Sequence, residues 1–356
     1  MRTVDRAMEF CKRFGLRLPV LQAPMAGSSP PELAIAVAEA GGMGASGALQ
    51  DSPERIAEWA RRFRAGSDGA FQLNIWIPQE SVLDPDERAE RVRAASEFLG
   101  QFGTPSEPDE PHPVRPVFAE QCDAMLAARP TAISSIMGLF PAEFVARMQA
   151  NGISWLCCAT SLEEALAAEA AGADAIVAQG MEAGGHRGSF AADKAEGTNV
   201  GLFALLPWFA DHLRIPIIAA GGIADGRGVA AALCLGASAV QVGTGLLRSP
   251  EAGISREWSD ALDGLAPEST VTTSAYTGRL ARAVATPYLG AWAVPGAPRP
   301  APFPDQLALV TRLRTGSPAG IDKGNHWTGQ SAALATTDPA GEIVTRMWRD
   351  AQALLS

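Results

Sequence analysis

The chain has 356 residues, of which 47% are hydrophobic and 19% charged, a composition typical of a globular protein with a large core. Its net charge of −10 excludes the basic surface that nucleic acids and anionic membranes require. No uninterrupted apolar run approaches the roughly 18 residues needed to cross a bilayer, and residues 1–8 lack an apolar signal core. We therefore expect a cytoplasmic protein that acts on small molecules.

Short apolar runs alternate along the chain with alanine-rich segments of helical character, as in repeated βα units around a parallel sheet. Helix ends are marked by a capping-box pattern at Ser161-Leu-Glu-Glu164, by Asp225 ahead of residues 228–235, and by Gly41-Gly42 after residues 31–40. Further helices are predicted over residues 84–99, 165–171 and 339–355. The predicted strands are residues 20–23, 43–46, 71–75, 132–136, 155–159, 175–179, 216–220 and 239–243.

Eight strands in this order predict an α/β fold, a (β/α)8 barrel of the TIM type. A doubly wound sheet is the competing architecture, but its usual Gly-x-Gly-x-x-Gly turn is replaced after the first strand by Ala23-Pro-Met-Ala-Gly-Ser28. Residues 103–117 are rich in proline and acids and predict a surface insertion. Residues 248–330 are largely proline-rich and not βα-periodic, so we assign them to a small substrate-side domain and residues 1–247 and 331–356 to the barrel.

Glycine turns follow the last two predicted strands. The chain reads Ala220-Gly-Gly-Ile-Ala-Asp225 after the seventh and Val242-Gly-Thr-Gly245 after the eighth. Free backbone N–H groups at strand-to-helix turns bind anions, and barrels commonly hold phosphate after these two strands. We therefore predict a phosphate group at Gly221, Gly222, Gly243 and Thr244. Sugar phosphates, nucleotides and flavin mononucleotide all stay open at this point.

The other strand ends carry amides and apolar side chains rather than acids. Met25 follows Ala23-Pro24, Asn74 lies in the third strand, and Gln179 ends the sixth. Such a lining suits a flat heterocycle read by hydrogen bonds and makes a flavin a candidate, although an amide can equally tie down loop backbone. The five cysteines show no metal spacing, and Cys157 and Cys158 point to opposite faces of one strand, so we expect buried thiols and no metal.

One of the four histidines, His186, lies in the glycine-rich loop Ala178-Gln-Gly-Met-Glu-Ala-Gly-Gly-His-Arg-Gly188, directly after the sixth strand. Gly184 and Gly185 allow a ligand to approach the backbone closely. The placement of His186 in this loop indicates a chemical role. Of the other histidines, His112 lies in the insertion and His212 on a helix-like surface, which leaves His326 as the one minor candidate for a place near the pocket.

At these residues the chain resembles the nitronate monooxygenase family, formerly called 2-nitropropane dioxygenases. The resemblance runs from Pro19-Val-Leu-Gln-Ala-Pro-Met25 to Trp327-Thr-Gly-Gln330. Between these ends it includes Gly41-Gly-Met-Gly44, Asn74, the His186 loop, Ala220-Gly-Gly-Ile223, Gln241-Val-Gly-Thr244, Thr277-Gly-Arg279 and Ala281-Arg282.

The resemblance implies a barrel that holds non-covalent FMN, with the active site between the barrel mouth and a smaller domain. It implies that His186 is the base beside the flavin, and that alkyl nitronates are oxidised by dioxygen to a carbonyl compound and nitrite. A histidine of near-neutral pKa can donate a hydrogen bond to a nitronate or remove the α-proton of a nitroalkane. Lys323 is a candidate cation for an anionic substrate, with a solvated loop lysine as the alternative. A small-molecule substrate and dioxygen are thus the expected partners, and a homodimer stays open.

One departure from the family pattern changes the expected substrate. Members often carry a histidine in a Ser-Phe-His-Phe-Gly segment after strand four, where this chain reads Ser134-Ser-Ile-Met-Gly138 and offers Ile136. The chain also has only two tyrosines, Tyr276 and Tyr288, which argues against a tyrosine-rich pocket. We therefore expect a more apolar pocket, open to a bulkier or less charged substrate or another electron acceptor.

Three alternatives to nitronate oxidation remain. An FMN-dependent enoyl-acyl-carrier-protein reductase of the same superfamily resembles the Glu-Ala-Gly-Gly-His segment but often has an acid where this chain has Gln179. An NAD(P)H:quinone reductase on the same scaffold is the second. A flavin-binding or ligand-sensing protein without turnover is the third. Ile136 favours this alternative, because it stands where family members often carry a histidine.

Overall fold

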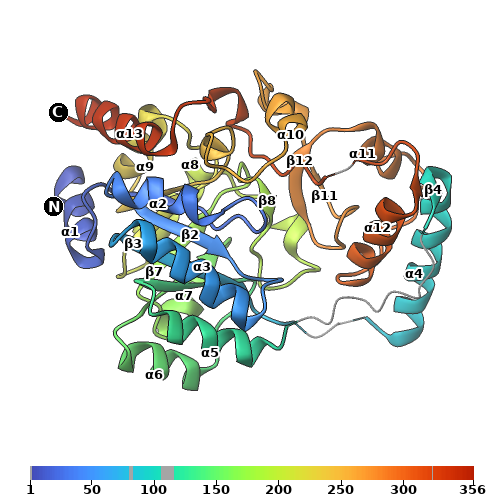
Figure 1. Cartoon of the computed structure of the whole chain (residues 1–356), viewed down its shortest axis with the longest axis horizontal. Coiled ribbons are helices and arrows are strands. Elements are labelled where there is room, and N and C mark those ends of the chain that lie inside the picture. Colours follow the sequence, from blue (N-terminus) through green and yellow to red (C-terminus); the bar gives the residue numbers. More distant parts are fainter. Residues whose placement is uncertain (1, 80–82, 106–115, 323) are drawn as a thin grey trace.

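In the computed structural model, a closed parallel barrel forms the larger part of the molecule (Figure 1). The structure describes residues 2–79, 83–105, 116–322 and 324–356. Around the barrel the strands run in the order β1-β10-β9-β7-β6-β5-β3-β2, each parallel to its neighbours. The predicted (β/α)8 fold is therefore confirmed. The barrel strands are β1 (Val20–Gln22), β2 (Met43–Gly47), β3 (Ala70–Trp76), β5 (Ala132–Ile136), β6 (Ser154–Ala159), β7 (Ala175–Gln179), β9 (Ile217–Ala220) and β10 (Ala239–Val242).

Helices cover the outside of the barrel. Asp225 caps α9 by accepting hydrogen bonds from the N–H groups of Arg227 and Gly228, as predicted. The last helix, α13, packs between α9 and α2 and completes the ring. These helices are α2 (Pro31–Glu39), α3 (Pro53–Gly66), α5 (Phe118–Ala128), α6 (Ala142–Ala150), α7 (Leu162–Ala170), α8 (Leu202–Ala210), α9 (Gly226–Cys234) and α13 (Ala340–Leu355).

The barrel interior is closed at its amino-terminal end by a helix that the sequence pattern did not predict. This helix, α1 (Thr3–Phe14), packs Phe10, Cys11 and Phe14 against interior side chains such as Leu21 and Leu156. The plug excludes water from that end of the barrel. An entrance for ligands is therefore left at the opposite end, where the strands carry their carboxyl termini.

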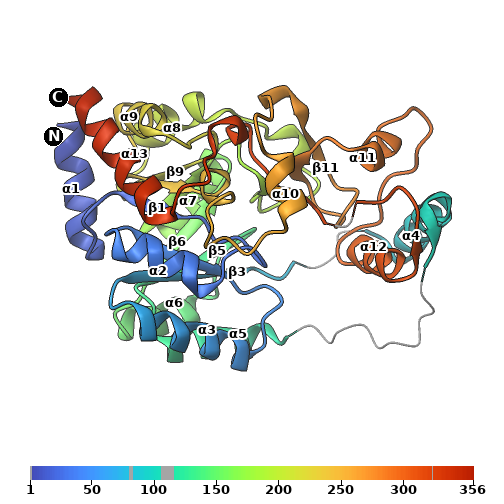
Figure 2. The same cartoon turned by 45° about the horizontal axis from the view of Figure 1, so that its top comes forward.

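A smaller unit lies over the carboxyl end of the barrel (Figure 2). Its apolar core unites α4 with the late part of the chain, including Tyr276, Tyr288 and Leu313. Three antiparallel strands in the order β11-β12-β8 join this unit to the loop that carries His186. The elements on this side are α4 (Pro85–Leu99), β4 (Gly103–Thr104), β8 (Gly185–His186), α10 (Arg256–Ala261), β11 (Thr270–Thr273), β12 (Ala281–Val284), α11 (Pro287–Trp292), α12 (Asp305–Thr315) and β13 (Ser317–Pro318). Along the whole molecule, short 3-10 turns lie at Gly100–Phe102, Ala195–Gly197, Thr244–Leu246, Pro267–Ser269 and Ala332–Leu334.

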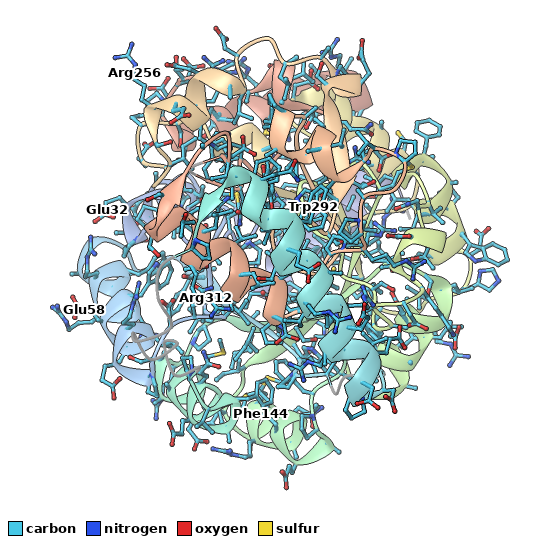
Figure 3. The ribbon with its side chains drawn as sticks, turned by 90° about the vertical axis from the view of Figure 1, so that its right-hand side faces the viewer. Glu32, Glu58, Phe144, Arg256, Trp292 and Arg312 are labelled. Atoms are coloured by element: carbon cyan, nitrogen blue, oxygen red, sulfur yellow. The ribbon has the colours of Figure 1, made fainter. Side chains whose placement is uncertain are left out.

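Helix α4 follows barrel strand β3 in sequence but packs in the smaller unit. Arg88 pairs with Asp305 of α12 through two bonds of 2.7 and 2.8 Å, and Phe98 lies against Trp292 of α11. Figure 3 faces this side of the molecule and labels Trp292. The smaller unit therefore draws on two separate parts of the chain, whereas the sequence analysis assigned only residues 248–330 to it. The division at 247/248 and 330/331 stays a prediction. Most of the predicted insertion, residues 106–115 with His112, lies outside the described residues.

Four of the five cysteines are buried as expected, but Cys234 is exposed near the end of α9. Cys157 and Cys158 do face opposite sides of β6, one toward the helices and the other toward the barrel interior. Among the described residues, no group of histidine, cysteine and carboxylate side chains is arranged to hold a metal ion. None of the described helices has the length and apolar character needed to cross a membrane.

Candidate active site

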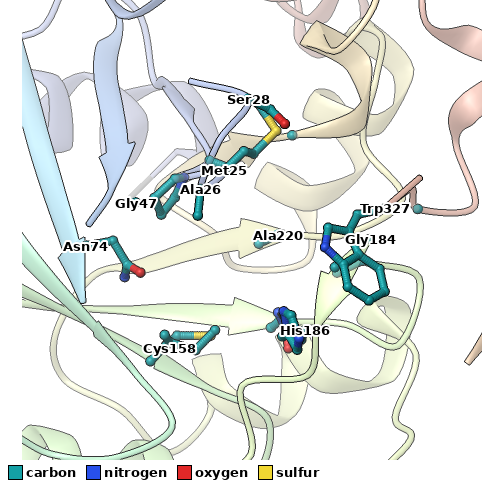
Figure 4. A pocket seen from close by; sticks show the side chains of 18 of the residues that line it. Met25, Ala26, Ser28, Gly47, Asn74, Cys158, Gly184, His186, Ala220 and Trp327 are labelled. Carbon is teal, nitrogen blue, oxygen red and sulfur yellow. Dashed lines mark hydrogen bonds between the residues drawn. The ribbon is translucent and has the colours of Figure 1, made fainter. Parts of the chain in front are cut away.

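A cavity of about 420 Å³ opens at the carboxyl end of the barrel and reaches under the smaller unit. Figure 4 shows Asn74 and Cys158 toward its barrel side and His186 and Trp327 toward its outer side. The predicted site residues come from the ends of six of the eight barrel strands, and they line this one cavity. The predicted residues that line it are Ala23, Pro24, Met25, Asn74, Ile136, Gln179, Gly184, Gly185, His186, Gly221, Gly222, Gln241, Gly243 and Thr244.

The two glycine turns form one face of this cavity. Gly221 and Gly222 have φ values of +116° and +68°, a conformation that disfavours any residue with a Cβ atom. Within the described residues, the N–H groups of Gly222 and Gly243 donate to no protein acceptor. Two unpaired backbone donors beside the start of α9 suit an anionic oxygen.

Amide side chains form part of the cavity floor. The Nδ2 atom of Asn74 donates to Ser134 O at 3.2 Å and Ser134 Oγ at 2.9 Å, which leaves Asn74 Oδ1 as a free acceptor. Gln241 accepts from Gln72 Nε2 at 3.2 Å and keeps its own Nε2 group as a donor. One acceptor and one donor are therefore available to a planar heterocycle.

Gln179 uses its amide differently. Its Nε2 donates to His186 O at 3.0 Å, and its Oε1 accepts from Gly188 N at 2.8 Å. Both ends of the amide thus hold the loop that carries His186. This is the second role named for these amides above, namely that they tie down loop backbone. A cofactor contact for Gln179 stays a prediction.

His186 is fixed on three sides. Its backbone pairs with Ala281 of β12, and its Nε2 lies 2.9 Å from Thr277 Oγ1. The rings of Trp76 and Trp327 meet the imidazole edge-on, with centroids at 4.6 and 4.9 Å. The side chain is therefore held in one orientation at the cavity wall.

The surroundings of His186 favour the neutral imidazole. Burial lowers its pKa to about 3, and the nearby positive charge of Arg279 contributes to the shift. The neutral imidazole is therefore the form that we expect in this environment. A neutral ring has one N–H donor and one lone pair, so it can either donate to an anion or accept a proton.

Buried charged residues hold the loops around His186, and the sequence analysis did not find them. Arg187 donates to Gln179 O and to Thr198 O, both at 2.7 Å. Glu164 accepts from Ser189 Oγ at 3.1 Å and Phe190 N at 2.7 Å. The only sequence signal for Glu164 was its position in the capping-box pattern. In the structure Ser161 caps α7, and the carboxylate of Glu164 accepts from Thr160 N at 2.7 Å.

The outer wall of the cavity is aromatic. Trp76 ends β3, and its ring lies 5.2 Å from that of Phe303 in the smaller unit. Together with Trp327, these rings form what we call the aromatic wall, and all three line the cavity. Only Trp327, within the family-like segment, carried a sequence signal. The wall joins residues that are distant in sequence, so no local pattern predicted it.

Ile136 lies on the barrel side of the cavity. A side chain added at Gly188 would come within 2.7 Å of Cys158 Sγ and 3.1 Å of Ile136 Cγ1, so these groups pack closely beneath the His186 loop. This position is apolar, as the sequence predicted. Tyr276 and Tyr288 are buried in the core of the smaller unit and do not line the cavity.

The remaining candidates lie elsewhere. His326, the minor candidate, is buried next to Trp258 and is not among the residues that line the cavity. His212 is on the surface, where it contacts Trp208. Lys323 lies outside the described residues, so its role stays a prediction.

A parallel barrel whose carboxyl rim carries one cavity, lined by two glycine turns and by His186, has the arrangement of a barrel enzyme. A family model described as nitronate monooxygenase matches residues 9–350. The chain belongs to the nitronate monooxygenase family.

Individual relatives agree with this assignment. The nitronate monooxygenase of Paraburkholderia phytofirmans is 39% identical over 342 residues, covering 94% of this chain and 93% of the relative. That of Pseudomonas aeruginosa is 37% identical over 346 residues, covering 94% and 96%.

Two solved structures resemble the whole molecule. Nitroalkane oxidase from Streptomyces ansochromogenes has a TM-score of 0.83 and 33% identity, covering 98% of this chain and 100% of its own. FabK from Thermotoga maritima has a TM-score of 0.74 and 26% identity, covering 98% and 96%. The chain is thus an oxidoreductase whose relatives share its full length.

Proposed function

We propose that this protein binds FMN and uses dioxygen to oxidise alkyl nitronates to a carbonyl compound and nitrite. The observation that supports it most is the placement of His186 and the glycine face around one cavity. Membership of the nitronate monooxygenase family makes this chemistry the first candidate.

The residues present fit a flavin. The unpaired N–H groups of Gly222 and Gly243 suit its phosphate, and the free groups of Asn74 and Gln241 suit the polar edge of its ring. When bound, the flavin would supply the redox chemistry with substrate and dioxygen. Ala23, Pro24, Met25, Gly184, Gly185, Gly221 and Thr244 would complete its site.

The protein's own groups would bind the substrate and handle its proton. A neutral His186 can take the α-proton of a nitroalkane through its lone pair. Arg279, buried beside the site, adds positive potential that favours an anionic substrate. The aromatic wall limits the access of water to the reacting carbon.

Reduction of an enoyl thioester or a quinone with NAD(P)H is the second candidate, and the similarity to FabK favours it. The two candidates differ in the reductant that the flavin accepts. A flavin-binding protein without turnover is the third.

Anaerobic mixing of the purified yellow holoprotein with propionate 3-nitronate, and separately with NADPH, distinguishes all three. Bleaching of the flavin absorbance by the nitronate, with nitrite formed on admission of air, supports the proposed function. Bleaching by NADPH alone supports the reductases. If neither compound bleaches the flavin, the enzymatic proposals fail together.

Dioxygen, a homodimer and a cytoplasmic location remain predictions. Nitrite yield as a function of dissolved oxygen checks the first, and sedimentation of the holoprotein checks the second.

A further inference from the structure

The hydroxyl of Thr277 lies at the centre of three close contacts. Its Oγ1 is 2.9 Å from His186 Nε2 and 3.3 Å from both the N and the O of Arg279. Thr277 is only 3% exposed, so water does not easily replace any of these partners. The hydroxyl therefore faces one backbone donor, one backbone acceptor and one ring nitrogen.

A hydroxyl has one proton to give and two lone pairs that accept. All three contacts are hydrogen bonds at once in a single arrangement: Thr277 donates to Arg279 O, and accepts from Arg279 N and from His186 Nε2. In the opposite arrangement Thr277 donates to His186 Nε2. That leaves Arg279 O without any hydrogen bond among the described residues, and a buried unpaired carbonyl is unfavourable.

We infer that Thr277 is a positioning residue that keeps the ring proton of His186 on Nε2, so that the lone pair on Nδ1 is the group that meets the substrate. No hydrogen-bond partner is assigned to Nδ1 within the described part of the chain, and His186 lines the cavity. The role of the Nδ1 lone pair toward the substrate rests on the proposed function. The tautomer itself is independent of the reaction.

Other contacts maintain this arrangement. The guanidinium of Arg279 donates to Gln79 Oε1 at 2.5 Å and to Ser189 O at 3.4 Å. These bonds help to fix the backbone N–H and C=O of Arg279 that contact the Thr277 hydroxyl. Trp76 and Trp327 prevent the imidazole from turning away from Thr277. The ring therefore has little freedom to present the other nitrogen.

The direct test is the tautomer of His186 in the holoprotein, measured by 15N NMR with histidine labelling and assigned through H186N. The inference predicts a protonated, pyrrole-type Nε2 and an unprotonated, pyridine-type Nδ1. In T277V the Nε2–H would face a methyl group, so the populations should shift toward protonated Nδ1. T277S should restore the original pattern, and T311V, which loses a hydroxyl bonded only within α12, should leave it unchanged.

Kinetics supplies the second readout. T277V should lower kcat/KM for a neutral nitroalkane about tenfold, because this substrate needs the lone pair, and should change the value for its nitronate less than threefold. Protonated Nδ1 in the wild type, an unchanged tautomer in T277V, or equal losses on both substrates would overturn the inference. If the holoprotein oxidises neither substrate, the proposed function fails, while the NMR pattern still decides the tautomer.

Discussion

The amide of Gln179 holds His186 in place: it donates to the carbonyl of His186 at 3.0 Å and accepts from the N–H of Gly188 at 2.8 Å. The last residue of β7 thus sets the path of the loop that crosses the cavity wall. An acid at this position would keep the acceptor but lose the donor.

We expect Q179E to lower turnover and to destabilise the protein by about 1–3 kcal/mol, because the His186 carbonyl would face a carboxylate oxygen. The negative charge should also raise the pKa of His186. Urea unfolding and nitrite production measure the two effects. Q101E, on the exposed side of the smaller unit, is the matched control, and equal behaviour of the two variants would contradict the positioning role of Gln179.

The low pKa of His186 predicts a characteristic pH dependence. Because the folded pKa is about 3 and the ordinary value is 6.5, the unfolded state binds an extra proton between these pH values. Stability should therefore be fully present above about pH 6.5 and fall as the pH is lowered, by at most ~1.4 kcal/mol per pH unit from this group.

Unfolding free energies of the wild type and H186N at pH 7.5 and pH 5 test this dependence. The loss on acidification should be smaller in H186N than in the wild type, and H212N, altered at the surface, should behave as the wild type. The activity of the wild type on nitronates should show no inflection from His186 between pH 5 and 8. An inflection that disappears in H186N would contradict the low pKa.

The aromatic wall predicts a preference for substrates with a flat apolar substituent. The kcat/KM of an aryl nitronate should exceed that of propionate 3-nitronate, and W76A should lower this ratio about tenfold, equivalent to ~1.4 kcal/mol. W208A, which removes an exposed indole on α8, is the control. A ratio that W76A leaves unchanged would exclude the wall from substrate selection.

Ile136 gives a complementary prediction. In I136H, a polar ring would replace an apolar side chain beside Cys158 and restore the residue that family members often carry. We expect the ratio of activities to shift toward the small, charged propionate 3-nitronate. I136V, which shortens the side chain without adding polarity, should not produce the shift.

The glycine face predicts how the phosphate is held. G222A would place a Cβ atom at φ +68°, at a cost of about 1–2 kcal/mol, and disturb one of the two unpaired N–H groups. Titration of the apoprotein with FMN and with riboflavin should show that the wild type prefers FMN and that the variant loses much of this preference. Equal losses for the two flavins would argue against a phosphate contact at this turn.

The barrel and its rim were predictable from sequence because each strand is a short apolar run followed by a turn with its own composition. Gly221-Gly222, Asn74 and His186 stand directly after or within such runs, so the topology brings them together. Contacts between distant segments were not predictable. Neither the position of α1 at the end of the barrel nor the packing of α4 against α12 leaves a local signal. Both depend on which distant part of the chain the apolar face of the helix packs against.

The same distinction holds within the site. The pKa of His186 depends on its burial and on Arg279, and its orientation depends on Trp76, Thr277 and Trp327. All four of these residues are distant from His186 in the sequence. Residue type and position were sufficient to find the histidine. They did not determine its protonation.

Because α4 and β4 belong to the smaller unit while β3 and α5 belong to the barrel, the chain passes between the two parts before residue 118 as well as after residue 247. A body attached at several separate points can turn only about an axis that passes near all of them, which restricts how it moves over the cavity. We therefore expect the rings of Trp76 and Phe303, which line the cavity on either side of the junction, to limit the size of substrate that enters.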